Sequence, residues 1–172
     1  MPTGLPLVRR RCPTCGPGRF RASGRFRANA NHKLIDAWLL VRCTGCGVTA
    51  KLTVLVLVLV RSLRAGLLER LQDNDPGLVA ELLRDPRVLR RNRVGLDWDG
   101  AWRLDAEYRD RTPVTVSVRF AAPIPVRPVR LIAEARGLSR AEVHHLITAG
   151  KLVSTVRLTA PTANTFTFIL KP

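Results

Sequence analysis

The chain has 172 residues, which is enough for one ordinary domain or two small ones. Because 46% of its residues are hydrophobic, it can bury a core, and this excludes a disordered tail. Its formal net charge of +16 favours a polyanionic partner, since Lys and Arg side chains neutralise phosphates and release their counterions. An anionic membrane surface is the alternative partner for such a charge.

The basic residues are unevenly distributed along the chain. Residues 1–60 hold ten Lys and Arg residues against one acidic residue, residues 61–125 hold twelve against ten, and residues 126–172 hold seven against two. Both ends are therefore strongly basic, whereas the middle is nearly balanced. We interpret this pattern as two binding segments joined by a structural one.

The first segment predicts neither an export signal nor a membrane span. Arg9, Arg10 and Arg11 lead directly to Cys12, whereas a secretory signal has an apolar stretch after its basic residues. The most apolar run is residues 52–60, and it is far shorter than the roughly 20 residues of a membrane-spanning helix. We therefore expect a cytoplasmic protein in which this run forms a buried strand.

Two cysteine pairs with the spacing Cys-x-x-Cys lie in this segment, each followed by a glycine. Two intervening residues let one tight turn present both sulfurs to the same ion, and the glycine fits a backbone that turns closely around them. Without an export signal, such pairs favour a metal site over disulfides. Four thiolates close a tetrahedral site, so we predict a structural zinc ion bound by Cys12, Cys15, Cys43 and Cys46. A rubredoxin-type iron site with the same ligands and free thiols are the alternatives.

Arginine and phenylalanine alternate between the two cysteine pairs, before Asn31-His32-Lys33. Arginines beside aromatic and amide side chains suit a loop that contacts phosphates and bases, and this interpretation makes Arg25, Arg27 and Lys33 nucleic-acid contacts. The alternative is a strand that turns its phenylalanines toward the core and its arginines toward solvent. Because four cysteines fill the metal site, we do not expect His32 as a ligand.

The residues around the cysteines resemble a bacterial protein family. The two cysteine pairs, with Phe-Arg-Ala-Asn-Ala-Asn-His-Lys-Leu-Ile-Asp-Ala-Trp-Leu at residues 26–39 between them, are similar to domain-of-unknown-function 1062. The resemblance extends over most of the chain, including Asn74-Asp75-Pro76 and the C-terminal segment. It implies an architecture but no activity, and its metal-ligand role applies only to the four cysteines.

Strands and helices are expected from residue 34 to residue 120. Branched apolar residues predict strands at 34–42 and 48–60. Leucines at three- and four-residue spacing predict two helices, one from Leu67 and one started by Asp75 and Pro76. Residues 97–100 fit a turn, and alternating apolar residues over 114–120 predict a half-buried strand.

The last segment predicts two short helices. Pro128 starts the first and Gly137 ends it, while Ser139 and Glu142 form a capping box for the second, which ends at Gly150. Each helix has one apolar face, so the two should pack together. We expect the other, basic face to contact phosphates through Arg127, Arg130, Arg136, Arg140, His144 and Lys151.

This helix pair resembles the alpha-L RNA-binding domain found in small-subunit ribosomal protein S-four, tyrosyl-tRNA synthetases and pseudouridine synthases. Leu-Ser-Arg at 138–140 and Leu-Ile-x-x-Gly-Lys at 146–151 carry the resemblance. Val129 stands where the family usually has aspartate, and the usual Asn-Gly hairpin is missing after Lys151. The resemblance implies binding to structured RNA, while the helix spacing is also compatible with a DNA-reading helix-turn-helix.

No catalytic motif accompanies these features. The sequence contains no phosphate-binding loop, nucleophile elbow or zinc-protease helix. Asp97, Asp99 and Asp105 form an acidic cluster that could bind a cation, but Asp97-Trp98-Asp99-Gly100 fits a hairpin turn better. We therefore expect a binding protein and not an enzyme, with no small-molecule substrate.

Together, these patterns predict an α+β protein in three segments. Residues 1–60 form a zinc ribbon, residues 61–125 a helical and strand-containing middle, and residues 126–172 an alpha-L-like helix pair. The expected partner is nucleic acid, with RNA preferred over DNA. A DNA-binding transcriptional regulator and a protein-interaction module with a structural zinc are the alternatives.

Overall fold

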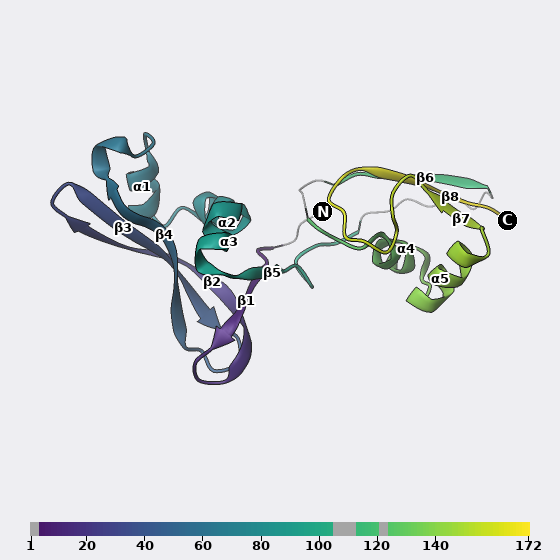
Figure 1. Ribbon diagram of the computed structural model, residues 1–172, viewed down its shortest axis with the longest axis horizontal. Coiled ribbons are helices and arrows are strands. Elements are labelled where there is room, and N and C mark those ends of the chain that lie inside the picture. The colour runs from purple at the N-terminus through teal and green to yellow at the C-terminus, as the bar shows by residue number, and fades with distance from the viewer. Residues whose placement is uncertain (1–3, 105–112, 121–123) are drawn as a thin grey trace. The chain divides into compact units, whose positions relative to one another are not determined.

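The computed structural model describes residues 4–104, 113–120 and 124–172, and Figure 1 shows their secondary structure. Within these ranges, eight strands form two antiparallel sheets, accompanied by five α-helices and one 3-10 turn. The predicted α+β class is therefore confirmed. Among the described residues, no helix is long and apolar enough to cross a membrane. Asp105, from the acidic trio of the sequence, lies outside the described ranges.

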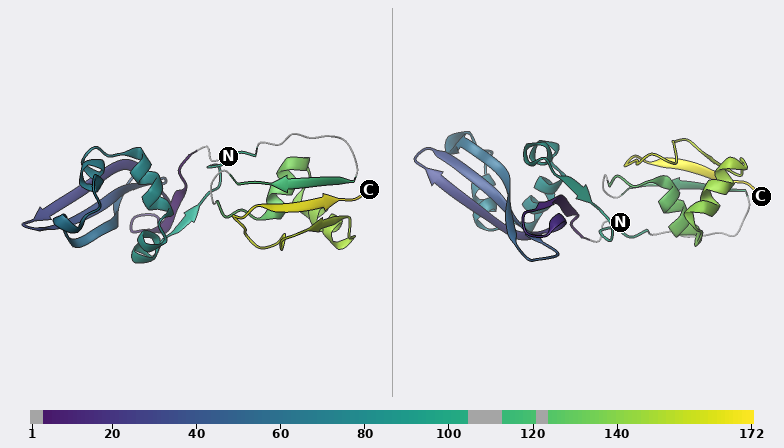
Figure 2. Two further views of the ribbon diagram at one scale, coloured as in Figure 1. Left: turned by 90° about the horizontal axis from the view of Figure 1, so that it is seen from above. Right: turned by 60° about the horizontal axis from the view of Figure 1, so that its bottom comes forward.

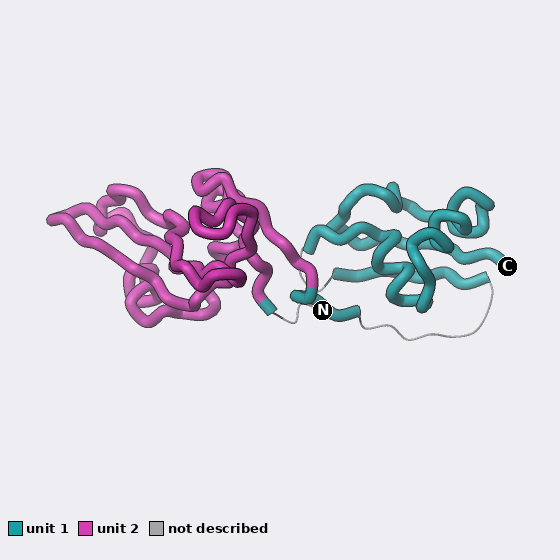
Figure 3. Tube along the Cα trace, turned by 90° about the horizontal axis from the view of Figure 1, so that it is seen from below, with its two compact units in different colours: residues 1–4, 100–172 teal, residues 5–99 magenta. Residues whose placement is uncertain are grey.

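The contacts divide the chain into two compact units, shown in different colours in Figure 3. Residues 5–99 form the N-terminal unit, and residues 100–172 form most of the C-terminal unit. This boundary differs from the predicted division at residues 60 and 125. The physical reason is that leucines of the segment after residue 60 share a core with the strands that precede it.

The N-terminal unit consists of a five-stranded antiparallel sheet and three α-helices. The strand order is β4-β3-β2-β1-β5. The strands are β1 (Leu7–Cys12), β2 (Gly16–Asn31), β3 (Leu34–Cys43), β4 (Thr49–Leu59) and β5 (Gly95–Asp97). Between β4 and β5 lie η1 (Val60–Ser62), α1 (Leu67–Gln72), α2 (Pro76–Arg84) and α3 (Pro86–Asn92).

Alternation along the strands decides which side chains enter the core. Phe20, Leu39 and Leu52 are fully buried and cluster with the helix residues Leu78 and Leu83. Successive side chains of a strand point to opposite faces, so the residues between these core positions point away from the helices. We call the helix-packed side of the sheet the core face and the opposite side the open face.

The side chain of Asn74 forms a hydrogen bond at a β-bulge in β2. The β2–β3 register shifts between Ala22 and Phe26, and the Phe26 N–H bonds to a side chain outside the sheet. That N–H donates to Asn74 Oδ1 at 2.7 Å. Asn74 itself has a positive φ of 55°, a conformation that asparagine tolerates better than most residues.

An ion-pair cluster joins α1 to α2. Arg70 contacts Asp75 at 2.7 Å and Glu81 at 2.9 Å. The Arg70 guanidinium is the main cause that lowers the pKa of both carboxyl groups. Asp75 also accepts a bond from the Leu78 N–H, so it is the N-cap that the sequence predicted for this helix.

The C-terminal unit packs a helix pair against a three-stranded sheet (Figure 2). Its strands are β6 (Val114–Val118), β7 (Leu152–Ser154) and β8 (Phe166–Leu170), in the order β6-β8-β7, and its helices are α4 (Pro128–Arg136) and α5 (Arg140–Thr148). The predicted capping box of Ser139 and Glu142 is confirmed. So is Gly137 as the residue that ends the first helix.

Two sequence-based expectations in the N-terminal unit are wrong. Residues 25–31 continue strand β2 and are not a loop, so the strand alternative holds for them: Phe20 is buried and Phe26 packs against the core. The apolar run 52–60 is buried only in its first half, since Val56 and Leu57 are 50% and 58% exposed. The β4 edge bulges there, and the Leu57 N–H bonds to Asp36 instead of following the regular ladder.

We predict that Asn74→Ala lowers the free energy of unfolding by about 1–3 kcal/mol. The change removes the acceptor of the Phe26 N–H and places alanine at a strained positive φ. Denaturant unfolding measures the loss, and hydrogen exchange of the β2 amides should rise around Phe26. Asn74→Gly is the matched variant, because it removes the amide without the backbone strain and should lose less stability. Unchanged stability in both variants would show that the bulge does not need this bond.

Candidate metal centre and basic sheet face

The two cysteine pairs lie in the turns that connect β1 to β2 and β3 to β4. Cys12 ends β1 and is paired with Gly16, while Cys43 ends β3 and is paired with Phe20 of β2. The second turn is anchored to β2 because the N–H and the hydroxyl of Thr44 both donate to the Arg19 carbonyl, at 2.8 and 3.0 Å. The sheet register therefore brings both turns to the same end of the sheet.

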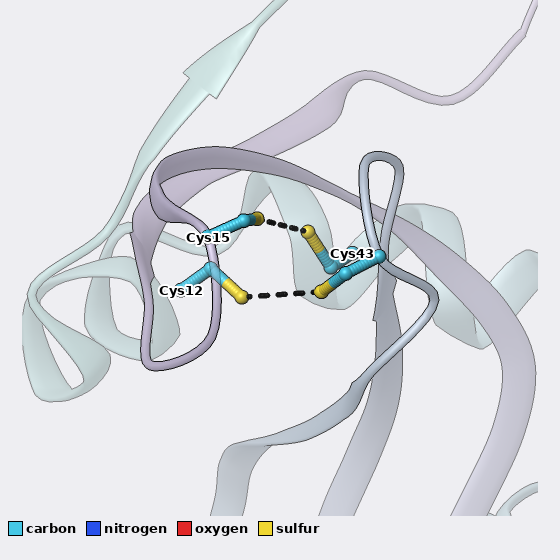
Figure 4. A group of neighbouring side chains, drawn as sticks. Cys12, Cys15 and Cys43 are labelled. Atoms are coloured by element: carbon cyan, nitrogen blue, oxygen red, sulfur yellow. Dashed lines mark hydrogen bonds between the residues drawn. The ribbon is translucent and has the colours of Figure 1, made fainter.

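The four sulfurs form one cluster, of which Figure 4 labels three cysteines. The Sγ atoms of Cys12 and Cys46 are 3.6 Å apart, those of Cys15 and Cys43 are 3.5 Å apart, and all four lie within 4.8 Å of one another. Sulfurs bound tetrahedrally to one zinc ion at about 2.3 Å would be about 3.8 Å apart. A disulfide requires about 2.05 Å, and the four cysteines are free. The cluster can therefore hold one metal ion.

Hydrogen bonds from backbone N–H groups lower the pKa of two of these thiols. The N–H of Cys15 is the main cause that lowers the pKa of Cys12 to about 6, and the N–H of Cys46 lowers the pKa of Cys43. The hydrogen bond with Cys43 raises the pKa of Cys15 to about 12. The first cysteine of each turn is thus favoured as the thiolate, the form that binds metal.

Glycines give the backbone the close turns that the sulfurs require. Gly16 and Gly47, which follow the two pairs, have φ values of 79° and 74°, as their positions in the sequence suggested. Gly18 lies so close to the cluster that a Cβ there would be 3.3 Å from the Cys12 Cβ. The backbone therefore passes close to the buried side of the cluster, at Cys12 and Cys43, while Cys15 and Cys46 are exposed.

The open face of the sheet beside the cysteine cluster is strongly basic. The register places Arg9 opposite Arg19 and Arg21 opposite Arg42, so like charges face each other across neighbouring strands. All four side chains are exposed. The strands of this unit contain two acidic residues, of which Asp97 pairs with Arg19 at 2.8 Å. The positive charge of this face is therefore only partly balanced.

Two hollows lie on this basic surface. One is next to the metal centre, and its lining includes Arg9, Arg11, Arg19 and the backbone around Thr44. The other lies at the β2 bulge, and its lining includes Arg21, Ser23, Arg25, Leu40 and Arg42. Both hollows combine guanidinium groups with hydroxyl groups, which suits oxyanions such as phosphate.

Arg10 differs from its neighbours in β1. It points to the core face, where its guanidinium lies 5.6 Å from the Phe20 ring centroid and donates to the Lys51 carbonyl at 3.2 Å. A cation over an aromatic ring stabilises the packing. Arg10 is therefore a structural arginine.

The predicted nucleic-acid contacts occur in both units. In the N-terminal unit, Arg25, Arg27 and Lys33 are exposed, the first two on β2 and the third in the turn to β3. In the C-terminal unit, the exposed members of the set are Arg127, Arg140, His144 and Lys151. These positions are accessible to a ligand, and their role as contacts stays a prediction.

Two arginines of the predicted helix surface are partly buried. Arg130 is half-buried, with its guanidinium 5.2 Å from the centroid of the Trp102 ring, and Arg136 is also half-buried. The Arg130 guanidinium, which was expected to face phosphate, therefore already contacts the Trp102 ring. Arg140 on α5 and Lys151 in the turn that follows it remain exposed, as do Arg103, Arg119, Arg127 and Arg157 elsewhere in this unit.

The strand register brings together six basic residues that the predicted set of nucleic-acid contacts does not include. The set comprises Arg9, Arg11, Arg19, Arg21, Arg42 and Lys51. Members on different strands are far apart in the chain and become neighbours only through the strand register. The two-residue alternation of Arg19-Phe20-Arg21 was the pattern that pointed to them, since it is typical of a half-buried strand.

Comparisons with known proteins place the chain in a family. A family model described as "Protein of unknown function (DUF1062)" matches residues 28–158. The match covers the second cysteine pair and the helix pair α4–α5, and it begins after the first cysteine pair. Searches of curated proteins and of solved structures found no match. Since the family model covers most of the sequence, the chain belongs to the DUF1062 family.

Proposed function

We propose that this protein binds nucleic acid, that its ligand is RNA, and that a structural zinc ion stabilises it. The observation that carries the proposal is the basic open face of the N-terminal sheet, which lies directly beside the four-cysteine cluster. The proposed ligand is a polyanion and not a small molecule.

Zinc is the metal that best fits the donor set. Four thiolates supply all four ligands of a tetrahedral site and leave no open position for a water molecule, which is typical of structural zinc. Two cysteine turns at the ends of antiparallel strands form the arrangement of a zinc ribbon. Iron can bind the same four sulfurs, so the metal content of the purified protein distinguishes the two.

The like-charge pairs on the open face favour an anionic ligand. Arg21 and Arg42 repel each other across the strands, and directly opposed like charges destabilise a sheet; Arg9 also lies opposite Arg19, whose charge Asp97 partly balances. A phosphate between two guanidinium groups replaces that repulsion by charge-assisted hydrogen bonds. A chain of phosphates, as in RNA, matches several such pairs at once.

The alpha-L-like segment supplies the argument for RNA over DNA. Its two capped helices and the basic residues Arg140, His144 and Lys151 resemble an RNA-binding module, and we assign them as a second contact surface. A DNA-binding regulator and a protein-interaction module are the competing functions. Affinities for structured RNA and for duplex DNA, measured at one stated salt concentration, distinguish an RNA-binding protein from a DNA-binding regulator. Equal or tighter binding to duplex DNA would overturn the RNA preference.

We predict one zinc ion per chain, which Cys43→Ser loses. Replacing a thiolate by a hydroxyl should weaken zinc binding by more than about 100-fold and unfold the adjoining turns, because binding energy is also folding energy at such a site. Elemental analysis gives the metal content, and a chromophoric chelator gives the affinity. Thr44→Ser is the matched control, since it changes the same turn and keeps the cysteine. Iron in place of zinc, or a variant that keeps its metal, would contradict the assignment.

We predict that Arg21→Glu/Arg42→Glu weakens RNA binding by at least about tenfold. The plot of log affinity against log salt concentration should also become shallower by about 1–2, as two phosphate contacts disappear. Arg87→Glu/Arg90→Glu is the matched control, because it makes the same change in net charge at exposed positions of α3. Equal losses in both variants would show that net charge matters and that the open face is not a specific surface.

The second contact surface has its own prediction. Arg140→Glu/Lys151→Glu should reduce RNA affinity by about tenfold, since both side chains are exposed and each would lose a phosphate. Filter binding with one structured RNA measures the effect. If the variant binds as tightly as the wild type, the helix pair packs the unit and does not contact RNA.

A further inference from the structure

We propose that the open face of the N-terminal sheet binds a single-stranded segment of nucleic acid, with one base stacked on the indole of Trp38. This inference rests on the proposed function and names the form of ligand that this face accepts. It assigns a role to Trp38, for which the sequence suggested none.

Trp38 lies outside the core although its neighbours in the chain are inside it. Ala37 and Leu39 are fully buried on the core face, whereas Trp38 is half-buried on the open face with Leu40 and Arg42. Burying an indole in the core would have stabilised the fold far more than leaving it on a polar face. Its position therefore calls for a ligand that uses an aromatic surface.

Two basic side chains lie beside this indole, and Asp36 lies on the same face of β3 two residues away. Arg27 is its register partner on β2, and the ammonium group of Lys51 lies 4.9 Å from the centroid of its ring. Nonspecific binding to single strands combines these two elements, an aromatic ring for a base and cations for the adjoining phosphates. A base that stacks on the ring takes the place of the Lys51 ammonium, which then faces the phosphate backbone.

The dimensions of the sheet disfavour a duplex. Five strands about 4.8 Å apart make a face about 19 Å wide, whereas the major groove of a B-form duplex is about 12 Å wide. The deep, narrow major groove of duplex RNA is less accessible still. A duplex could contact this face through its phosphates and groove edges but could not stack a base on Trp38, because the faces of its bases are stacked on one another. A single strand exposes its bases and can lie along β3, where Trp38 and Arg42 are about 13 Å apart.

The test uses tryptophan fluorescence as a direct report of stacking. The chain contains three tryptophans, so Trp98→Phe/Trp102→Phe leaves Trp38 as the sole indole. The probes are a 12-nucleotide oligouridylate and the same strand paired with oligoadenylate, at equal salt concentration. We expect the single strand to quench Trp38 emission saturably and to bind at least tenfold tighter than the duplex.

A substitution separates stacking from charge. In the otherwise wild-type protein, Trp38→Leu should weaken binding of the single strand by about 5- to 100-fold, with Trp38→Phe restoring part of the loss. Trp102→Leu is the matched control, since that indole lies in the C-terminal unit beneath Arg130. Zinc content and circular dichroism check that each variant is folded.

Different results overturn the proposed function and the stacking of a base on Trp38. If the protein binds neither probe nor structured RNA, or binds only anionic lipid vesicles, the proposed function fails and the inference fails with it. If RNA binds but the duplex is preferred, or Trp38 emission stays unquenched at saturation, only the inference is overturned. Quenching of the single-tryptophan protein decides the matter even if Trp38→Leu does not fold.

Discussion

The N-terminal unit depends on the meeting of two cysteine turns at one end of its sheet. Each turn alone closes only a local connection, β1 to β2 or β3 to β4, but the four sulfurs within 4.8 Å of one another join the two hairpins. A metal ion bound there ties strands together at a point where the flanking side chains are mutually repelling arginines. The basic face beside the cluster can therefore remain dense in charge without the sheet opening at that end.

The same strands separate the core from the charge. A period of two places Phe20 and Leu39 under the helices, and it places Arg19, Arg21 and Arg42 on the opposite side. The helices therefore have two effects: they supply the apolar surface that stabilises the unit, and they leave the opposite face of the sheet uncovered by this unit's helices. A binding surface made in this way is rigid, because its backbone is the hydrogen-bonded ladder itself, and rigid elements hold a binding constellation more accurately than loops.

Much of the local structure could be predicted because its causes are local. The Cys-x-x-Cys spacing, the N-cap at Asp75 and the capping box at Ser139 each depend on residues within a few positions of one another. The open face could not be found in this way, since Arg9, Arg21 and Arg42 meet only through register. Nor could the link from Asn74 to the β2 bulge, which joins residues 48 positions apart in the chain. Residues 25–31 were misassigned because arginine and asparagine suit a loop as well as an exposed strand.

The arginine pairs also bear on how stability and binding are related in this fold. Opposed like charges reduce the stability of the free sheet, and that reduction disappears when an anion lies between them. The free energy recovered adds to the affinity for the ligand, because anything that binds only the folded state stabilises it. A sheet that is weakened by opposed arginines needs support from elsewhere. In this unit the support comes from the helices on the core face, from Asn74 at the bulge, and from the thiolate cluster at the end where Arg9 and Arg19 meet.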